Sequence, residues 1–588
     1  MTRSRLLVAI LAFHFAGCGS ETQQPSSPST PIEPALVELL AYYDAHYDPD
    51  RGMLRLPFAS PGYHSRVAMG TMVHPTRESL IYALALLQRG GEADASRAAE
   101  ILRRLLPLQD TDGDSPTYGV WPWLAEEPIA AMAEPDLNWA DFCGAPIAQM
   151  LIDHADQLPR ESVAALRTSL RHAAAAIRAR DVGPAYTNVA VLGGGVCAAA
   201  GEILDDATLL AYGRRRLEGI VEHTARHGGF NEYNSPPYTK VVIAECERTL
   251  HLVRDEATRA AAESLRRTAW QTVAESFHPA TGQWAGPHSR TSRNRLRKET
   301  VDFLARRTGV EIAPHPTMAD GEPRGYAVVH PLPCPDDLAV PLRPKRNGAA
   351  DPREIRRVFI RGKTDADSTI GTTWRSGDAC LGSVNRSTFW TQRKPVIGYL
   401  KTAEDPAVVF RLRFLHDGRD FASMGLRTLQ RGPRLLAVLR PLPRQGDWHP
   451  RLDRPTDGVF QAGDLRARFE LQGVGVRAAA LSGGRVALIA GGHHVVIHTT
   501  TGRFAGNHVV WVLGSEEDRV YLDAVCHHGD ARAFNFNQPL ECTLAAGIEL
   551  LRSDQPPIES PPVVTFHAPS RYEASWEIAH GTRITVAD

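Results

Sequence analysis

The stretch RESLIYALALLQ at residues 77–88 has the period of a helix with a buried face. Its apolar residues recur at intervals of three and four, which predicts an α-helix. Seven further stretches with this period lie at 94–106, 146–157, 161–178, 188–204, 207–225, 240–253 and 258–277. Helices of this length joined by short turns stack antiparallel. Because several are apolar over most of their circumference, we expect an inner ring of helices covered by an outer ring, which is an α/α toroid.

Beyond about residue 363 the period changes from helical to two. Short runs rich in Val, Leu and Phe, separated by Gly, Asp and Pro, lie at 367–373, 407–415, 435–439, 465–472, 485–489, 494–499 and 509–513. This alternation predicts antiparallel strands. The predicted fold class is therefore α+β and multidomain, with an N-terminal (α/α) toroid at 35–313, a Pro-rich linker at 314–363 and an antiparallel β-sandwich at 364–588.

The first residues predict an export signal. Arg3 and Arg5 precede an apolar run over 6–15, which has about half the ~20 residues needed to cross a bilayer. The run ends in Phe-Ala-Gly-Cys18, which resembles a bacterial lipobox, although ordinary export with an incidental cysteine is the alternative. We expect a lipoprotein signal peptide at 1–17, lipidation at Cys18 and a flexible tether at 18–34. The mature chain would be an exported bacterial lipoprotein, membrane-anchored in the periplasm or at the cell surface.

Composition and motifs exclude several classes of protein. With 66 Lys+Arg against 67 Asp+Glu the net charge is −1, so no global field attracts nucleic acid. The hydrophobic and charged fractions, 43% and 23%, are those of a globular protein. The sequence has no C-x-x-C pair, Walker loop, H-E-x-x-H or G-x-S-x-G. We therefore expect no metal, no cofactor and no nucleic acid partner, and the oligomeric state stays open.

The stretch HGGFNEYNSPPYTKVVIAE at residues 227–245 carries the most informative pattern. Gly228 and Gly229 permit a tight turn, and the two prolines before Tyr238 stiffen the approach to the next predicted helix. Asn188 opens another predicted helix fifty residues earlier, which is about one helical hairpin. We expect both helix starts to open on the same side of the toroid.

An Asn at one helix start, followed by Gly-Gly…Glu…Ser-Pro-x-Tyr, resembles the heparinase II/III and alginate lyase superfamily, in which an α/α toroid precedes a β-sandwich. The resemblance implies a polysaccharide lyase that cleaves a uronic-acid-containing polysaccharide by β-elimination. It implies that Tyr238 abstracts the C5 proton and protonates the leaving oxygen, while Asn188 helps to neutralise the uronate carboxylate. Two features depart from the family: the interval from Glu232 to Tyr238 is one residue longer, and the His-x-His-x-Asp signature of the β-domain is absent.

The chemistry of β-elimination requires a positive charge near the tyrosine. A C5–H beside a carboxylate is barely acidic until the carboxylate's charge is offset. A phenol with an ordinary pKa of about 10 also needs help to act as a base. Candidates for this charge are His227, His288 and Arg290, with His223 weaker. If the sandwich contributes, we expect His416 or the segment 390–393.

Other residues in the long loops of the toroid, together with Arg393 and His416 of the sandwich, are candidates for contacts with a sugar. The predicted substrate-binding residues are Trp121, Trp123, Trp139, Glu127, Tyr233, Asn234, Arg393 and His416. Structural alternatives remain open: large aromatics such as these tryptophans more often pack in a core, and an Asn at a helix start, as Asn188 is, is often a cap.

Two other functions remain open from the sequence. Toroid folds also host glycoside hydrolases that use two carboxylates ~5 to ~10 Å apart, and Glu126, Glu127, Asp136 and Glu232 are the candidates. A non-catalytic glycan-binding surface lipoprotein would use the aromatics but not Tyr238. For a polysaccharide lyase, the expected partner is an anionic polysaccharide.

Overall fold

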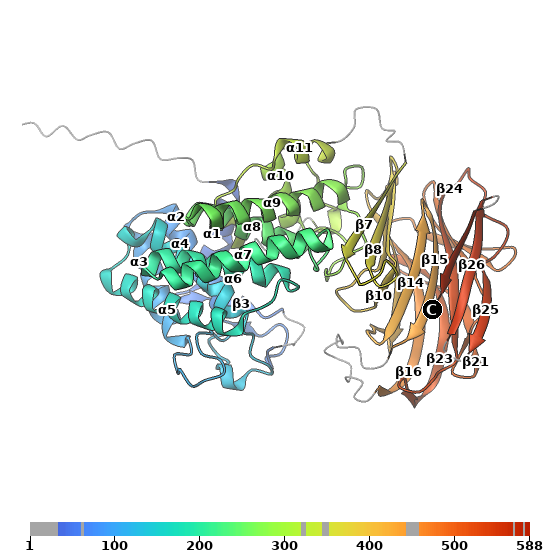
Figure 1. The fold of residues 1–588 in the computed structure, drawn as a ribbon, viewed down its shortest axis with the longest axis horizontal. Coiled ribbons are helices and arrows are strands. Elements are labelled where there is room, and N and C mark those ends of the chain that lie inside the picture. Colours follow the sequence, from blue (N-terminus) through green and yellow to red (C-terminus); the bar gives the residue numbers. More distant parts are fainter. Residues whose placement is uncertain are drawn as a thin grey trace, which may run out of the picture.

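The computed structural model describes residues 33–59, 64–318, 325–343, 352–442, 458–568, 571–579 and 582–587. Helices form one half of the molecule and strands the other (Figure 1). The predicted fold class, a helical N-terminal part followed by an antiparallel β-sandwich, is confirmed. The predicted signal peptide and Cys18 lie outside the described residues.

The helical part is built from four hairpins, and all eight predicted helices are present. They are α2 (Thr76–Arg89), α3 (Glu92–Leu105), α4 (Trp139–Asp153), α5 (Arg160–Arg180), α6 (Thr187–Leu204), α7 (Ala207–His227), α8 (Pro236–Leu252) and α9 (Glu256–Ser276). Helix α1 (Pro34–Asp44) precedes them, and α10 (Lys298–Thr308) and α11 (Asp336–Ala339) follow. Trp139 is the first residue of α4, whereas the sequence predicted that this helix begins at residue 146.

The first helix of each hairpin forms the inner layer. Helices α2, α4, α6 and α8 pack side by side, and α3, α5, α7 and α9 cover them. Every residue of α6 from Thr187 to Gly201 is buried, which explains its long apolar sequence. Close packing needs glycine here: a Cβ on Gly195 would lie 2.3 Å from Thr249 Oγ1, and one on Gly213 would lie 2.4 Å from the backbone N of Ala198.

A short segment bridges the two ends of the inner row, α2 and α8. The 3-10 turn Gly325–Val328 packs on α1 and α2. The Nζ atom of Lys240 in α8 lies 5.2 Å from the centroid of the Tyr326 ring. The inner row is therefore an open toroid whose gap is spanned by this turn.

Two sheets of nine strands form the sandwich, and all their pairings are antiparallel. The first runs β10 (Arg386–Thr388), β14 (Met424–Arg431), β15 (Arg434–Pro441), β24 (Cys542–Arg552), β19 (His493–Thr499), β18 (Arg485–Ala490) and β17 (Arg477–Leu481), with β20 (Arg503–Phe504) and β21 (Asn507–His508) beside β24. The second runs β22 (Val510–Glu516), β23 (Arg519–Asn535), β16 (Val459–Gln472), β12 (Val408–His416), β11 (Val396–Leu400), β9 (Ala379–Val384), β8 (Thr369–Arg375) and β7 (Arg353–Ile360), with β13 (Arg419–Asp420) beside β12.

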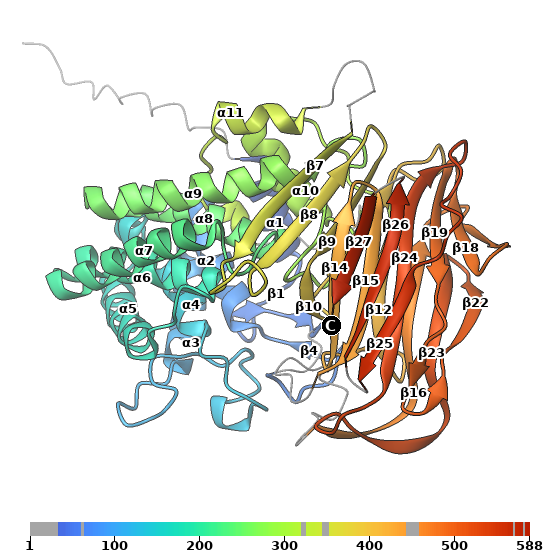
Figure 2. The same ribbon diagram turned by 45° about the vertical axis from the view of Figure 1, so that its right-hand side comes forward.

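A third sheet covers the outer face of the first. It consists of β25 (Val563–Ala568), β26 (Arg571–Ala579) and β27 (Thr582–Ala587), drawn in red in Figure 2. Tyr572 and Trp576 of β26 pack on Leu436 and Val438 of β15, which gives this layer a core of its own. The remaining short pairs are β1 (Tyr47–Asp48) with β2 (Met53–Leu54), β3 (Leu56–Pro57) with β4 (Met72–Val73) and β5 (Phe277–His278) with β6 (Gln283–Trp284).

One strand lies where the sequence predicted a linker. Strand β7 falls within residues 314–363 and pairs with β8 along its length. Its sequence, REIRRVFI, carries three arginines. These charges obscured the alternation of apolar and polar residues that is typical of a strand. The position matters, because β7 lies beside the helical part, where it contacts α7.

The helical and strand parts meet at the loop after β6. The carbonyl of Gly286 accepts a hydrogen bond from Thr373 Oγ1 at 2.7 Å. A Cβ built on Gly382 of β9 would lie 1.9 Å from that carbonyl oxygen, so only glycine fits. Backbone hydrogen bonds of 3.0 Å in both directions join His288 to Lys394. The loop is thus fixed to the sheet.

We expect Gly382→Ala to weaken this junction. Because the new methyl group would overlap the backbone of residue 286, the free energy of unfolding should fall by about 1–3 kcal/mol, measured by urea denaturation. Gly113→Ala is the matched control, since a Cβ at Gly113 meets nothing within 4 Å. Equal stability of the two variants would contradict the close contact.

Candidate active site

Asn188, Glu232, Arg290 and Tyr238 form one continuous cluster. Asn188 is the second residue of α6, Glu232 lies in the loop before α8, and Tyr238 is the third residue of α8. The backbone N and Nδ2 of Asn188 donate to Glu232 Oε2 at 2.9 and 2.6 Å. Arg290 Nη1 donates to Glu232 Oε1 at 3.3 Å, and Arg290 Nη2 donates to the Tyr238 hydroxyl at 3.0 Å. The two helix starts do open on one side.

Arg290 is held by groups from both parts of the chain. Its guanidinium carbon lies 4.7 Å from the Tyr238 ring centroid and 5.2 Å from that of Trp390. Its Nε donates to Gln392 Oε1 at 2.8 Å. Its own carbonyl accepts from Ser235 Oγ at 2.6 Å, and Ser235 also caps α8. The sandwich therefore reaches the site through segment 390–393.

Burial and Arg290 shift the pKa values of Tyr238 and Glu232 in opposite directions. Burial raises the pKa of Tyr238, and Arg290 opposes that shift. Burial also raises the pKa of Glu232, opposed by Arg290 and by the hydrogen bonds from Asn188. Tyr238 is thus protonated at neutral pH in the free protein, and Arg290 is placed to stabilise the phenolate when it forms.

A cleft of about 740 Å³ lies beside this cluster. Tyr186, Glu232, Tyr233 and Arg290 line its helical side. The sandwich side carries four more arginines, which are Arg386, Arg393, Arg427 and Arg440. Glu232 is the one acidic residue among the described residues that line the cleft. The described lining of the cleft is therefore rich in basic residues, although the whole chain is almost neutral.

The register of the sheet brings two of these arginines together. Arg386 of β10 pairs directly with Arg427 of β14. Like charges opposite each other on neighbouring strands are unfavourable, and Arg386 Nη1 donates to the carbonyl of Asp367 at 2.9 Å. The pairing of Arg386 with Arg427 could not be predicted from the sequence, because the two residues lie 41 positions apart in the chain.

Several predicted residues, Tyr238 among them, do not themselves line the cleft. Asn188 is itself only 1% exposed and does not line the cleft, so the structure places it behind Glu232. His288 is buried, and its Nδ1 bonds to the Asn234 carbonyl at 2.7 Å. Burial lowers the pKa of His288 to about 4, so it is neutral. His227 Nδ1 accepts from the backbone N of Arg361 at 3.0 Å and does not line the cleft.

The loop residues predicted to bind substrate divide into two groups. Tyr233 and Arg393 line the cleft, and the Tyr233 ring stacks on Phe359 of β7 at 4.3 Å between centroids. Asn234 is buried, with its Nδ2 donating to the carbonyls of Ala285 and Pro287 at 2.9 and 2.7 Å. His416 packs among aromatic rings of the sandwich, and its Nε2 bonds to the Gln461 carbonyl at 2.8 Å.

The tryptophans and the rival carboxylates have partners elsewhere. Trp121 is buried in the helical core, and Trp123 stacks on Trp139 with 5.0 Å between centroids. Glu127 accepts from the backbone N of Arg66, Glu126 pairs with His74, and Asp136 accepts from Trp123 and Asn138. None of these lines the cleft among the residues described.

Comparisons with known proteins give one family model and several solved structures. A model described as a domain of unknown function (DUF8769) matches residues 36–301, which include α2 to α9. No curated protein matches the sequence. A heparan sulfate lyase HepC mutant from Pedobacter heparinus matches over 96% of this chain and 91% of its own, at 9% identity and a TM-score of 0.34.

Two other structures match at a similar level. A chondroitin AC lyase mutant from Streptomyces coelicolor matches over 89% of this chain and 97% of its own, at 10% identity and a TM-score of 0.34. A heparinase III with methylated lysines matches over 87% of this chain and 83% of its own, at 10% identity and a TM-score of 0.33.

The raised pKa of Glu232 gives a pH-dependent prediction. The charged carboxylate is less favourable in the folded than in the unfolded chain, so stability falls as pH rises from the ordinary glutamate pKa of about 4.3 towards the folded value. Arg290 limits this loss of stability, because its guanidinium pairs with the charged Glu232 carboxylate. We expect Arg290→Met to lower the thermal midpoint more at about pH 7 than at about pH 4, measured by differential scanning calorimetry.

Arg393→Met is the control, because Arg393 lines the same cleft and its side chain bonds to Thr388. Its effect on the midpoint should be similar at both pH values. A loss for Arg290→Met that does not change with pH would show that Arg290 does not hold the Glu232 carboxylate.

Proposed function

We propose that this protein is a polysaccharide lyase that cleaves a uronic-acid-containing polysaccharide by β-elimination. The observation that carries the proposal is the contact of Arg290 with both the Tyr238 hydroxyl and Glu232 beside a basic cleft. This contact supplies the two things that the reaction needs, a proton-transfer group and a cation next to it.

In the proposed reaction the uronate carboxylate binds at Arg290, which offsets its charge and makes the C5 proton more acidic. Tyr238 first loses its phenolic proton to water, Arg290 stabilises the resulting phenolate, and the phenolate oxygen takes the C5 proton. The C5–H electron pair forms the C4–C5 double bond, the bond from C4 to the glycosidic oxygen breaks, and Tyr238 returns the proton to the leaving oxygen. The products are an unsaturated uronate and a new sugar end, and the tyrosine is regenerated.

Asn188 has a different role in this proposal from the one that the family resemblance implies. Its amide donates to Glu232, and Glu232 in turn holds Arg290. We infer that Asn188 is a positioning residue, which acts on the substrate carboxylate through Glu232 and Arg290.

The cleft arginines support an anionic polymer as the substrate. Besides Arg290, the described lining of the cleft includes Arg386, Arg393, Arg427 and Arg440 along the sandwich wall, where acidic groups of neighbouring sugars would lie. The glycoside hydrolase alternative has less support, because it needs two carboxylates facing one sugar and Glu232 is the one that lines the cleft among the described residues.

The proposed location rests on the sequence alone. The basic start, the apolar run and the lipobox-like Phe-Ala-Gly-Cys18 support export and attachment of the chain to a membrane by a lipid. We propose that the enzyme acts outside the cytoplasm, where anionic polysaccharides are accessible to it.

The test of the proposal is an assay of the purified chain against a panel of uronate polysaccharides. We expect ultraviolet absorbance from an unsaturated uronate, and a loss of at least about a hundredfold in kcat for Tyr238→Phe. New reducing ends without that absorbance would indicate a hydrolase, and retention without turnover would indicate a binding protein.

Tyr186→Phe is the matched control, because Tyr186 lines the cleft and its hydroxyl accepts from Asn138 rather than from Arg290. Its kcat should change by less than about tenfold. Full activity in Tyr238→Phe together with loss in Tyr186→Phe would move the proton-transfer role to Tyr186.

A second prediction concerns the paired arginines. Because Arg386 and Arg427 lie away from the reacting atoms, Arg386→Gln and Arg427→Gln should each raise KM about tenfold with little change in kcat. The effect should shrink at high salt, which screens the charges. Arg503→Gln, which removes a charge paired with Glu541 elsewhere on the sandwich, should leave KM unchanged. Unchanged KM in both cleft variants would contradict an anionic substrate along this wall.

A further inference from the structure

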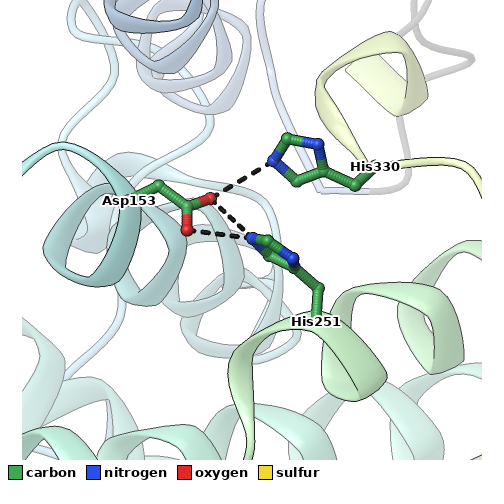
Figure 3. Close-up of side chains that lie close together, drawn as sticks. All are labelled: Asp153, His251 and His330. Carbon is green, nitrogen blue, oxygen red and sulfur yellow. Dashed lines mark hydrogen bonds and ion pairs between the residues drawn. The ribbon is translucent and has the colours of Figure 1, made fainter. Parts of the chain in front are cut away.

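A separate cluster of metal-ligand residues lies in the helical part (Figure 3). Asp153 is the last residue of α4, His251 lies in the last turn of α8, and His330 follows the turn Gly325–Val328. His251 Nε2 lies 2.9 Å from Asp153 Oδ1 and 3.0 Å from Oδ2, and His330 Nε2 lies 3.4 Å from Oδ2. None of the three lines the arginine-lined cleft.

We propose that Asp153, His251 and His330 form a zinc site. Imidazole nitrogen and carboxylate oxygen are ordinary zinc ligands, with bonds of about 2.0–2.2 Å. A tetrahedral ion with such bonds holds its ligand atoms roughly 3.4 Å apart. One ligand atom from each of the three residues lies within 4.8 Å of the other two, so small side-chain rotations suffice to bind the ion.

The surroundings favour a cation at this position. Helices α4 and α8 both end here, and the last turn of a helix carries partial negative charge. The Asp153 carboxylate adds a full charge. The side chains of Asp153, His251 and His330 are 14%, 37% and 50% exposed, so an ion can enter from solvent and keep a water as its fourth ligand.

The site would clamp the segment that closes the open toroid. The carbonyl of Val328 already accepts from Gln88 Nε2 of α2 at 2.8 Å and from Gln149 Nε2 of α4 at 3.0 Å. An ion held by His330, two residues later, would join the same segment to the ends of α4 and α8. The site is therefore structural, and it stabilises the helical part without entering the lyase reaction.

The test uses the purified full chain without a histidine tag. After incubation with zinc and gel filtration, elemental analysis should find one zinc per chain. Because the ion binds the folded state, the thermal midpoint should rise by at least about 2 °C and return when EDTA is added. Asp153→Asn and His251→Ala should each weaken zinc binding more than about tenfold.

His528→Ala is the matched control, because His528 pairs with Asp464 at 3.0 Å in the sandwich, and among the described residues this pair belongs to no group of three metal ligands. It should bind zinc as the unaltered chain does. If the cluster were only a hydrogen-bonded His-Asp-His network, the variants would lower the midpoint but zinc would neither be retained nor shift it. That result, or equal zinc content in Asp153→Asn and the unaltered chain, would overturn the proposal.

Discussion

The site depends on one partly buried cation, the guanidinium of Arg290. Its terminal nitrogens bond to the Glu232 carboxylate and the Tyr238 hydroxyl, and its Nε bonds to Gln392 from the sandwich. A charge taken out of water is costly unless it is paired and hydrogen-bonded. These contacts meet that requirement, and at the same time they place a positive charge beside a phenol at the edge of an open cleft.

The rigidity of the loop that carries Arg290 comes from residues with no part in the chemistry. Asn234 bonds to two carbonyls of the 285–287 turn, His288 bonds to the Asn234 carbonyl, and the backbone of His288 pairs with that of Lys394. The loop therefore has few ways to move. The helical and strand parts are both needed to orient the arginine, which gives a physical reason for the two parts to be packed together in one chain.

The sequence was informative about features that depend on a single segment of the chain. Helical period located all eight helices of the hairpins, and the Pro-stiffened loop placed Tyr238 at a helix start near Asn188. The sequence was less informative about residues whose role depends on tertiary contacts. Asn234 and His288 resemble ligand-binding loop residues in sequence, yet both hold the loop together. Trp121, Trp123 and Trp139 pack in the core or on one another, as large apolar rings favour burial.

The basic wall of the cleft was beyond sequence reasoning for a different reason. Arg386, Arg427 and Arg440 lie in three strands, and a one-residue shift in register would turn each side chain to the other face. Strand β7 was also missed in the sequence, because its three arginines obscured the alternation that is typical of a strand. Because cross-strand partners come from distant parts of the chain, the charge of the cleft emerges only when the sheet is assembled.

The central claim is that Arg290 binds a uronate carboxylate while Tyr238 faces C5 of the same sugar. The most direct measurement is a crystal structure of Tyr238→Phe with a bound uronate oligosaccharide. The account predicts the carboxylate within hydrogen-bond distance of the Arg290 guanidinium, and the edge of the ring at residue 238 next to C5. A carboxylate bound elsewhere in the cleft, with C5 turned away from residue 238, would contradict it.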